Sequence, residues 1–228
     1  MGAEQVAIKV DSDQTVSGIL LVPKHPFACY VLAHGAGAGM THPFLRAVAE
    51  GLKERDMATL RYQFPYMQNG SKRPDRPPLA QATVRAAVAA ATSLVPTLPL
   101  FAGGKSFGAR MTSQAQAKAP LPAVAGLAFI GFPLHPAGHP SDDRAKHLSE
   151  VRVPMLFVQG TRDALADQRI FASVLKQLSG LATSHLIEDV DHSFHAPVRS
   201  GKTDGQVLDE ALDALTAWAR GIAKRTPH

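Results

Sequence analysis

Short apolar stretches alternate with segments of helical periodicity along this 228-residue chain, and no other feature limits the fold as strongly. Residues 27–33 (FACYVLA) are apolar at every position, which is typical of a strand covered on both faces in a parallel sheet. The next segment carries Phe44, Leu45, Val48 and Leu52 at helical spacing. Because such strand–helix units recur up to the C-terminus, the sequence predicts an α/β fold with a mostly parallel sheet.

The expected elements follow from these two periodicities. We expect two strands within residues 4–24, on either side of a turn at 11–13, and further strands at about 27–34, 57–65, 98–104, 123–132, 153–160 and 183–189. Helices are expected at about 42–55, 84–95, 107–118, 170–178 and 208–222, with a proline-rich, basic loop at about 65–78. No repeat or low-complexity segment interrupts the pattern, so we expect a single domain spanning residues 1–228.

Charge and cysteine content narrow the classes of function. The net charge of +5 comes from scattered basic residues that are not interleaved with aromatic ones, so we expect no nucleic-acid partner. Cys29 is the only cysteine, and its apolar neighbours predict a buried thiol in a reducing compartment. The chain has no run of eighteen apolar residues and no signal-peptide pattern, so we expect a soluble cytoplasmic protein with no membrane partner.

The segment PLFAGGKSFGARM at residues 99–111 allows two interpretations. Residues 103–106 (GGKS) match the end of a phosphate-binding loop, but Pro99 stands where that loop needs its first glycine, and an apolar strand fills the positions between. Residues 104–108 (GKSFG) also match G-x-S-x-G, a strained strand-to-helix turn that presents a nucleophilic serine. The strand before this turn and the helix after it favour the second interpretation.

A serine nucleophile needs a base, and the base needs an acid that orients it. The strand at 153–160 runs into Asp163 and the strand at 183–189 runs into His192, so both residues follow carboxyl ends of strands, where open α/β sheets place their sites. We therefore predict Ser106, Asp163 and His192 as the catalytic residues. The alternatives are an N-cap role for Asp163 and three neighbouring rivals: Asp189, Asp191 and His195.

Acyl transfer also needs backbone donors for the negative charge on the carbonyl oxygen. One donor is predicted to be the N–H of Phe107, directly after the nucleophile. The other is predicted in the glycine-rich turn HGAGAG at residues 34–39, at Ala36, with Gly35 and Gly37 as rivals. A dinucleotide-binding G-x-G-x-x-G is excluded there, because Met40 occupies the last position.

Two segments are expected to border the pocket. Residues 61–67 (RYQFPYM) follow a strand, and the predicted substrate contacts combine this segment with the glycine-rich turn: His34, Gly35, Gly37, Tyr62, Phe64 and Tyr66. The segment 132–150 is too short for a substantial lid, so we expect an open or lightly covered site. Its three histidines lack the spacing of metal ligands, and we expect neither a metal nor a cofactor: His135, His139 and His147.

The motifs HGAGAG, GGKSFGAR, GTRDAL and DHSF together resemble the α/β-hydrolase superfamily, near its dienelactone-hydrolase-like branch. They are also similar to the hydrolase-like domain in a subunit of the nonspecific-lethal chromatin complex and its small bacterial relatives. The resemblance covers nearly the whole chain and implies an eight-stranded, mostly parallel sheet flanked by helices, with Ser106, Asp163 and His192 as the triad. Dienelactone hydrolases proper use a cysteine at the position of Ser106, so their specific activity is not implied.

These features predict a serine hydrolase, a carboxylesterase or thioesterase that acts on a small to medium acyl substrate as a monomer or homodimer. A non-catalytic binding or scaffolding module that keeps the hydrolase fold is the alternative. The sequence leaves open the role of Lys105, which stands beside the predicted nucleophile.

Overall fold

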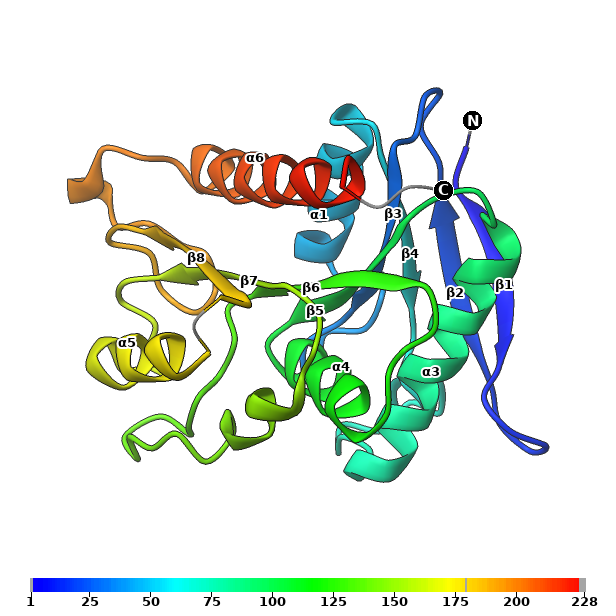
Figure 1. Cartoon of the computed structure of the whole chain (residues 1–228), viewed down its shortest axis with the longest axis horizontal. Coiled ribbons are helices and arrows are strands. Elements are labelled where there is room, and N and C mark those ends of the chain that lie inside the picture. Colours follow the sequence, from blue (N-terminus) through cyan, green and yellow to red (C-terminus); the bar gives the residue numbers. More distant parts are fainter. Residues whose placement is uncertain (1, 179, 226–228) are drawn as a thin grey trace.

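The computed structural model describes residues 2–178 and 180–225 and contains one eight-stranded sheet between two layers of helices (Figure 1). The strands are β1 (Glu4–Lys9), β2 (Thr15–Leu21), β3 (Ala28–Ala33), β4 (Met57–Tyr62), β5 (Leu100–Lys105), β6 (Val124–Ile130), β7 (Met155–Gly160) and β8 (Ala182–Ile187). The helices are α1 (Pro43–Glu54), α2 (Pro65–Gln68), α3 (Pro77–Leu94), α4 (Phe107–Lys118), α5 (Gln168–Gln177) and α6 (Asp204–Ala223), with 3₁₀ turns η1 (Lys146–Glu150) and η2 (Val198–Ser200).

The predicted order of strands and helices is confirmed, except in the segment predicted as a loop at 65–78. This segment contains the short helix α2, and α3 begins at its end, several residues before the predicted start. Both helices begin with proline at the first turn, at Pro65 and Pro77. A proline ring already holds the helical φ and lacks an N–H that would be unpaired there, so these prolines start helices where the sequence pattern predicted a loop.

The strand order is β1-β2-β4-β3-β5-β6-β7-β8. The pairs β1–β2 and β2–β4 are antiparallel, and all pairs from β4 to β8 are parallel, which confirms the mostly parallel sheet. The chain builds outward from β3 to β4 and then crosses back to place β5 on the other side of β3. Loops that leave β3 and β5 therefore diverge, which opens a crevice at the carboxyl edge of the sheet.

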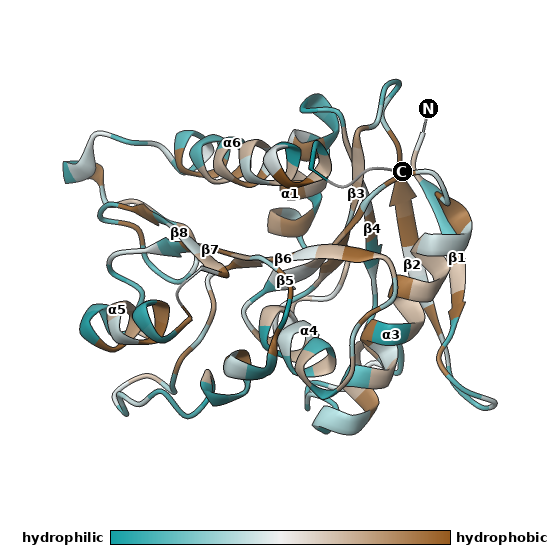
Figure 2. Cartoon of the chain, in the orientation of Figure 1, coloured by the Kyte–Doolittle hydropathy of each residue, from teal (hydrophilic) through white to brown (hydrophobic). Residues whose placement is uncertain are grey.

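Each face of the sheet packs on its own helix layer, as the apolar inner surfaces in Figure 2 show. In β3, Cys29, Val31 and Ala33 belong to the core under α3, α4 and α5. The alternate residues Tyr30 and Leu32 belong to the core under α1 and α6. This alternation explains why the strand is apolar at every position, because both of its faces are covered.

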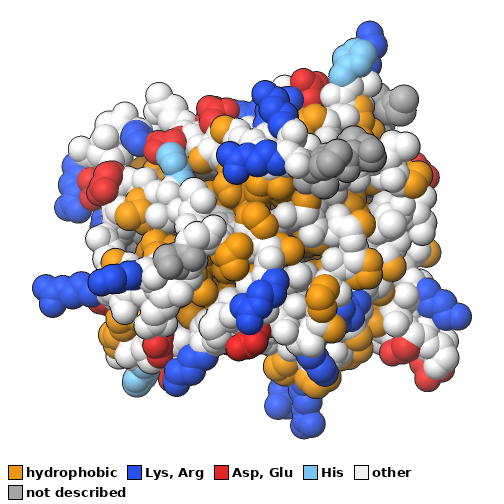
Figure 3. All heavy atoms as spheres, in the orientation of Figure 1, with side chains coloured by type: hydrophobic (Ala, Val, Ile, Leu, Met, Phe, Trp, Pro, Cys, Tyr) orange, Lys and Arg blue, Asp and Glu red, His pale blue; other side chains and the backbone are white. Residues whose placement is uncertain are grey.

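Many charged side chains lie toward the edge of the view in Figure 3, and apolar ones are concentrated toward its middle, with a few charged ones among them. Arg55, after α1, pairs with Asp209 and Asp213 of α6 at 3.0 and 2.6 Å and so links the two helices of one layer. Among the described helices, none is both long and apolar enough to cross a membrane.

The carboxyl edge of the sheet is open. The connection from β6 to β7 is the place where the sequence analysis considered a lid, and its regular structure within the described chain consists of the short η1 turn. The prediction of a site with minimal or no cover is thus confirmed.

Candidate active site

Ser106 stands between β5 and α4 with φ 51° and ψ −109°, a strained conformation for a residue with a side chain. The flanking glycines allow this turn to press against β3. A Cβ on Gly104 would lie 2.2 Å from the carbonyl oxygen of Ala33, and one on Gly108 would lie 2.6 Å from the Ala33 Cβ. The two glycines of G-x-S-x-G are therefore required by a close approach of backbones, and the turn lifts Ser106 above the sheet edge.

Ser106, His192 and Asp163 form a hydrogen-bonded chain across three loops of the sheet edge. The Ser106 Oγ lies 2.9 Å from His192 Nε2, and His192 Nδ1 lies 2.7 Å from Asp163 Oδ2. The Asp163 side chain is 0% exposed and that of His192 is 25% exposed, so the carboxylate is shielded while the imidazole reaches the surface. This arrangement can accept a proton from the serine and stabilise the imidazolium that results.

Two further groups hold the Asp163 carboxylate in place. Gln159, a buried side chain on β7, donates from Nε2 to Asp163 Oδ2 at 2.5 Å, and the N–H of Leu165 donates to Oδ1 at 2.8 Å. The Oε1 of Gln159 in turn accepts from the N–H of Phe132 at 2.9 Å. A polar residue inside an otherwise apolar strand is the signal in the sequence that points to Gln159.

The N-cap role that was the alternative for Asp163 belongs to another residue, and the rival residues have other partners. The N-cap of α5 is Asp167, whose carboxylate accepts from the N–H groups of Arg169 and Ile170. Asp191 accepts from two backbone N–H groups of its own turn, Asp189 pairs with Arg199 at 3.7 Å, and His195 pairs with Asp204 at 2.9 Å. These contacts shape the loop that carries His192.

Lys105 ties that loop to the end of β5. Its Nζ donates to the carbonyl oxygen of His192 at 2.5 Å and lies 5.1 Å from the centre of the Phe194 ring and 6.0 Å from that of Phe44. Burial lowers the pKa of Lys105 to about 8, although the charges of Asp163 and Asp191 act in the opposite direction. Lys105, the residue before the predicted nucleophile, therefore holds the backbone of His192, the predicted base.

The glycine-rich turn presents an unpaired backbone donor next to Ser106. The N–H of Gly37 is used, because it donates to the Tyr66 hydroxyl at 2.9 Å. In the described part of the chain, the N–H of Ala36 has no hydrogen bond to another protein group. Phe107 is the first residue of α4, so its N–H has no acceptor within the helix. Ala36, Phe107 and Ser106 line the same pocket.

His34 fixes the start of this turn. Its Nε2 accepts from the N–H of Phe64 at 3.0 Å, and its Nδ1 lies 2.7 Å from the carbonyl oxygen of Gly35. The Nδ1 therefore carries the proton, and burial lowers the pKa of His34 to about 4. The imidazole is a neutral bridge between the ends of β3 and β4, and it is fully buried beneath the pocket.

The aromatic residues of segment 61–67 lie deeper than the sequence analysis predicted. Tyr62 and Phe64 are 0% exposed and Tyr66 is 3% exposed. None of the three lines the pocket beside Ser106, so the structure gives no support for direct substrate contacts from them. Their rings pack in the core on the face of the sheet that α3 and α4 cover, and Tyr66 acts on the site by accepting a hydrogen bond from the N–H of Gly37.

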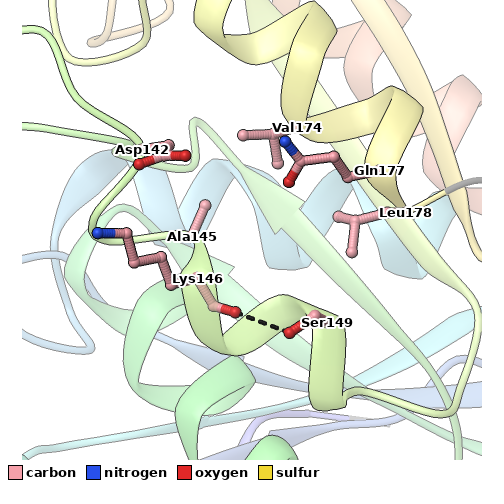
Figure 4. A pocket seen from close by; sticks show the side chains of 7 residues that line it. All are labelled: Asp142, Ala145, Lys146, Ser149, Val174, Gln177 and Leu178. Atoms are coloured by element: carbon pink, nitrogen blue, oxygen red, sulfur yellow. Dashed lines mark hydrogen bonds between the residues drawn. The ribbon is translucent and has the colours of Figure 1, made fainter.

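The pocket that contains Ser106 has a volume of about 390 Å³. It is lined by the turn at Ser106 with the first turn of α4, the glycine-rich turn, the start of α3 with the residues before it, and the segments after β6 and β7: Ala36, Pro74, Asp75, Pro77, Ser106, Phe107, Arg110, Pro133, Arg144 and Leu165. The segment 132–150 thus borders the pocket as predicted, but through Pro133 and Arg144. A smaller cavity of about 140 Å³ lies between η1 and the end of α5 and shares no residue with it (Figure 4).

A second serine–histidine pair joins α4 to η1. Ser113 Oγ is 2.7 Å from His147 Nε2 and donates to the carbonyl oxygen of Arg110 at 2.9 Å. Ser113 is fully buried, and among the described residues no carboxylate contacts His147, whose pKa is lowered to about 4 by burial and by the charge of Arg110. This pair lacks both an orienting acid and an opening to the pocket, so it serves packing.

The other histidines of the segment 132–150 are apart from one another. His135 accepts through Nε2 from the N–H of Asp167 at 2.9 Å and so supports the loop after Asp163. His139 lies at an exposed turn. Within residues 2–178 and 180–225, no group of three or more His, Cys, Asp or Glu side chains is placed to hold a metal ion.

A sequence model of the family "Alpha/beta hydrolase domain" matches residues 26–220. The chain belongs to the α/β hydrolases. Its fold is similar to that of a dienelactone hydrolase from Anabaena variabilis, at 21% identity and a TM-score of 0.73, over 100% of this chain and 99% of that one. The narrower similarity to the nonspecific-lethal complex subunit stays a prediction.

Two further solved α/β hydrolases share the fold. A serine hydrolase homologue from Coxiella burnetii is 19% identical with a TM-score of 0.75, over 95% of this chain and 97% of that one. XC6422 from Xanthomonas campestris, described as a serine hydrolase without a lid, is 19% identical with a TM-score of 0.71, over 93% and 94% of the two chains. At these identities the likeness concerns the fold, and the chemistry of this α/β hydrolase has to be argued from its own residues.

Proposed function

We propose that this α/β hydrolase is a single-domain serine hydrolase that cleaves carboxylic esters or thioesters of small to medium acyl groups. The observation that carries the proposal is the hydrogen-bonded chain from Ser106 through His192 to Asp163, with distances of 2.9 and 2.7 Å, at the mouth of an open pocket. Each role needs no metal or cofactor, because the nucleophile, the base and the orienting acid are side chains of this chain.

In the proposed mechanism, the Ser106 Oγ attacks the carbonyl carbon while His192 Nε2 takes the hydroxyl proton. The tetrahedral intermediate places a negative charge on the former carbonyl oxygen, and the N–H groups of Ala36 and Phe107 donate to it. His192 returns the proton to the leaving alcohol or thiol as the carbon–oxygen or carbon–sulfur bond breaks. Water then attacks the acyl-enzyme by the same steps, which frees the acid and restores Ser106.

The shielded carboxylate of Asp163 explains why the imidazole is an effective base here. Asp163 holds Nδ1 protonated, so the free lone pair of Nε2 faces Ser106. When His192 becomes positive, the negative charge of Asp163 lies 2.7 Å away in a site with little water, where the attraction is stronger than at the surface.

The test is the pair of variants Ser106→Ala and Ser113→Ala, which remove the hydroxyl from the two serines that contact a histidine. With p-nitrophenyl butyrate, Ser106→Ala should lower kcat by about 10⁴-fold or more, whereas Ser113→Ala should change kcat by less than about threefold. A fluorophosphonate probe should label the natural protein and Ser113→Ala, but not Ser106→Ala. Equal turnover by Ser106→Ala and the natural protein would contradict the proposal, and a folded protein that neither turns over esters nor reacts with the probe would favour a binding module.

A further inference from the structure

Two arginines share the pocket with Ser106. Arg110 lies in the first turn of α4, four residues after Ser106, and both side chains line the pocket. Arg144 reaches the pocket from the segment that follows β6. Burial lowers the pKa of Arg110, and the charge of Arg144 nearby lowers it further.

Neither guanidinium is neutralised by the protein. Within the described ranges, no carboxylate forms an ion pair with Arg110 or Arg144 and neither side chain has a hydrogen bond to another protein group, and the Nε of Arg110 is buried without a partner. Arg55, which is also partly buried, pairs with two carboxylates, whereas the buried Nε of Arg61 is like that of Arg110 without a partner; what distinguishes Arg110 and Arg144 is that both line the pocket with Ser106. Two like charges held together with an unsatisfied donor cost stability, which points to a role that folding does not explain.

The ionisable neighbours of the pair do not cancel its charge. His147 approaches Arg110 from η1 and is neutral at pH 7, because its pKa is lowered to about 4. Asp75 is the one carboxylate in the pocket lining, and its Oδ2 accepts from the N–H of Tyr66 at 3.1 Å. The lining therefore carries two positive charges and one negative charge.

We propose that Arg110 and Arg144 bind an oxyanion of the substrate, a carboxylate or phosphate group, so that this hydrolase prefers esters or thioesters with an anionic end. This inference rests on the proposed serine hydrolase activity and adds the class of substrate. An arginine fork offers paired N–H donors that match the oxygens of carboxylate and phosphate, and two such forks suit a group of one or two negative charges. The anion can belong to the acyl part or to the leaving group.

Two matched substrate pairs distinguish an anion on the acyl part from an anion on the leaving group. Mono-p-nitrophenyl adipate is compared with p-nitrophenyl hexanoate for a carboxylate on the acyl part, and butyryl-coenzyme A is compared with S-butyryl-pantetheine for phosphates on the leaving group. In at least one pair, kcat/KM should be about tenfold or more higher for the anionic member, and this preference should weaken as salt rises from about 0.05 to about 0.5 M. Equal kcat/KM for both members of both pairs would overturn the inference.

Three variants then identify the groups responsible. Arg110→Gln and Arg144→Gln should each lower the ratio of anionic to neutral kcat/KM by about tenfold, and Asp75→Asn should raise it. Arg152→Gln is the matched control, because Arg152 is exposed and pairs with Glu150 at 3.6 Å, and it should leave the ratio unchanged. A ratio that is insensitive to both pocket arginines would also overturn the inference.

A binding measurement keeps the inference apart from the proposed activity. Titration of the Ser106→Ala variant with adipate and with coenzyme A should give binding of one of them, weakened about tenfold by Arg110→Gln in the same background. If the natural protein hydrolyses neutral esters but neither anion binds, the hydrolase proposal stands and the oxyanion site falls. If an anion binds through Arg110 but no ester is hydrolysed, the oxyanion site stands and the hydrolase proposal falls.

Discussion

At the scale of single residues, the position of the predicted base depends on a contact that lies outside the triad. The loop that carries His192 is shaped by Asp191 and tied to β5 by the amine of Lys105, which donates to the His192 carbonyl oxygen. The rings of Phe44 and Phe194 lie near this amine. Lys105 is therefore a positioning residue, since it reaches the site through His192.

Replacing Lys105 by Met should keep the shape of the side chain and remove the donor. We expect kcat for p-nitrophenyl butyrate to fall by about 10- to 100-fold with KM nearly unchanged, because a loosened imidazole affects proton transfer more than binding. Lys146→Met, at an exposed pair with Asp143, is the control and should retain full activity. A kcat of Lys105→Met equal to that of the natural protein would show that His192 is held by the rest of its loop.

The same variant has a pH signature in stability. The pKa of Lys105 is about 8 in the folded protein and 10.5 in the unfolded chain, so between these values the unfolded chain binds more protons. The free energy of unfolding therefore gains a contribution from Lys105 as pH rises through this window. Above pH 9 the buried Cys29 lowers the free energy of unfolding, since burial raises the pKa of its thiol to about 12. Comparing the free energy of unfolding of the natural protein and of Lys105→Met over this pH range isolates the contribution of the lysine.

At the scale of elements, hydrogen bonds that involve two buried side chains fix the glycine-rich turn after β3. His34 bridges the ends of β3 and β4, and the Tyr66 hydroxyl on α2 accepts from the N–H of Gly37. Within residues 2–178 and 180–225, the neighbouring N–H of Ala36 has no protein partner. The short helix α2, which the sequence pattern did not predict, is thus part of the support for the proposed oxyanion donors.

Replacing Tyr66 by Phe should remove this support and leave the ring in place. We expect kcat to fall by about tenfold and the free energy of unfolding by about 1 kcal/mol, the net worth of one hydrogen bond. Tyr62→Phe is the matched control on β4, because the Tyr62 hydroxyl is buried and, in the described chain, makes no hydrogen bond to the glycine-rich turn. Its kcat should match that of the natural protein; similar kcat losses in both variants would point to general repacking.

At the scale of the whole molecule, two neutral imidazoles, the buried His34 and the partly buried His147, make the fold sensitive to acid. The pKa values of His34 and His147 are both lowered from 6.5 to about 4, chiefly by burial. Between these values the unfolded chain binds more protons than the folded protein, so stability is lost as pH falls from about 6.5 to about 4. His195 acts in the opposite direction, because Asp204 raises its pKa, but that pair is exposed and weak.

Thermal unfolding should show this sensitivity. The unfolding temperature should drop between about pH 6.5 and about pH 4.5, with His34 alone contributing on the order of 3 kcal/mol by the end of its titration. His147→Gln keeps a polar partner for Ser113 and should show a smaller drop. An equal drop in natural protein and His147→Gln would assign the acid sensitivity to other groups.

The layers and the chain order were predictable because they depend on local patterns. Apolar runs and helical stripes determine which segments become strands and helices, and the covered faces of β3 follow from its uninterrupted apolar run. The motifs around residues 106, 163 and 192 also predicted which side chains meet, since carboxyl ends of parallel strands share one edge. Pro65 and Pro77 were the missed local signals, and Gln159 on β7 was a third.

The sequence by itself thus determined the α/β architecture, the absence of an inserted lid helix between β6 and β7 in the described chain, and the order of the candidate residues along the strand ends. Only the tertiary structure decided which donors stay unpaired, that Tyr62 and Phe64 lie in the core, that Lys105 holds His192, and that Arg110 meets Arg144 without a carboxylate. The reason is physical: periodicity acts within a segment, whereas these partners come from segments that only the crossovers of the sheet bring together.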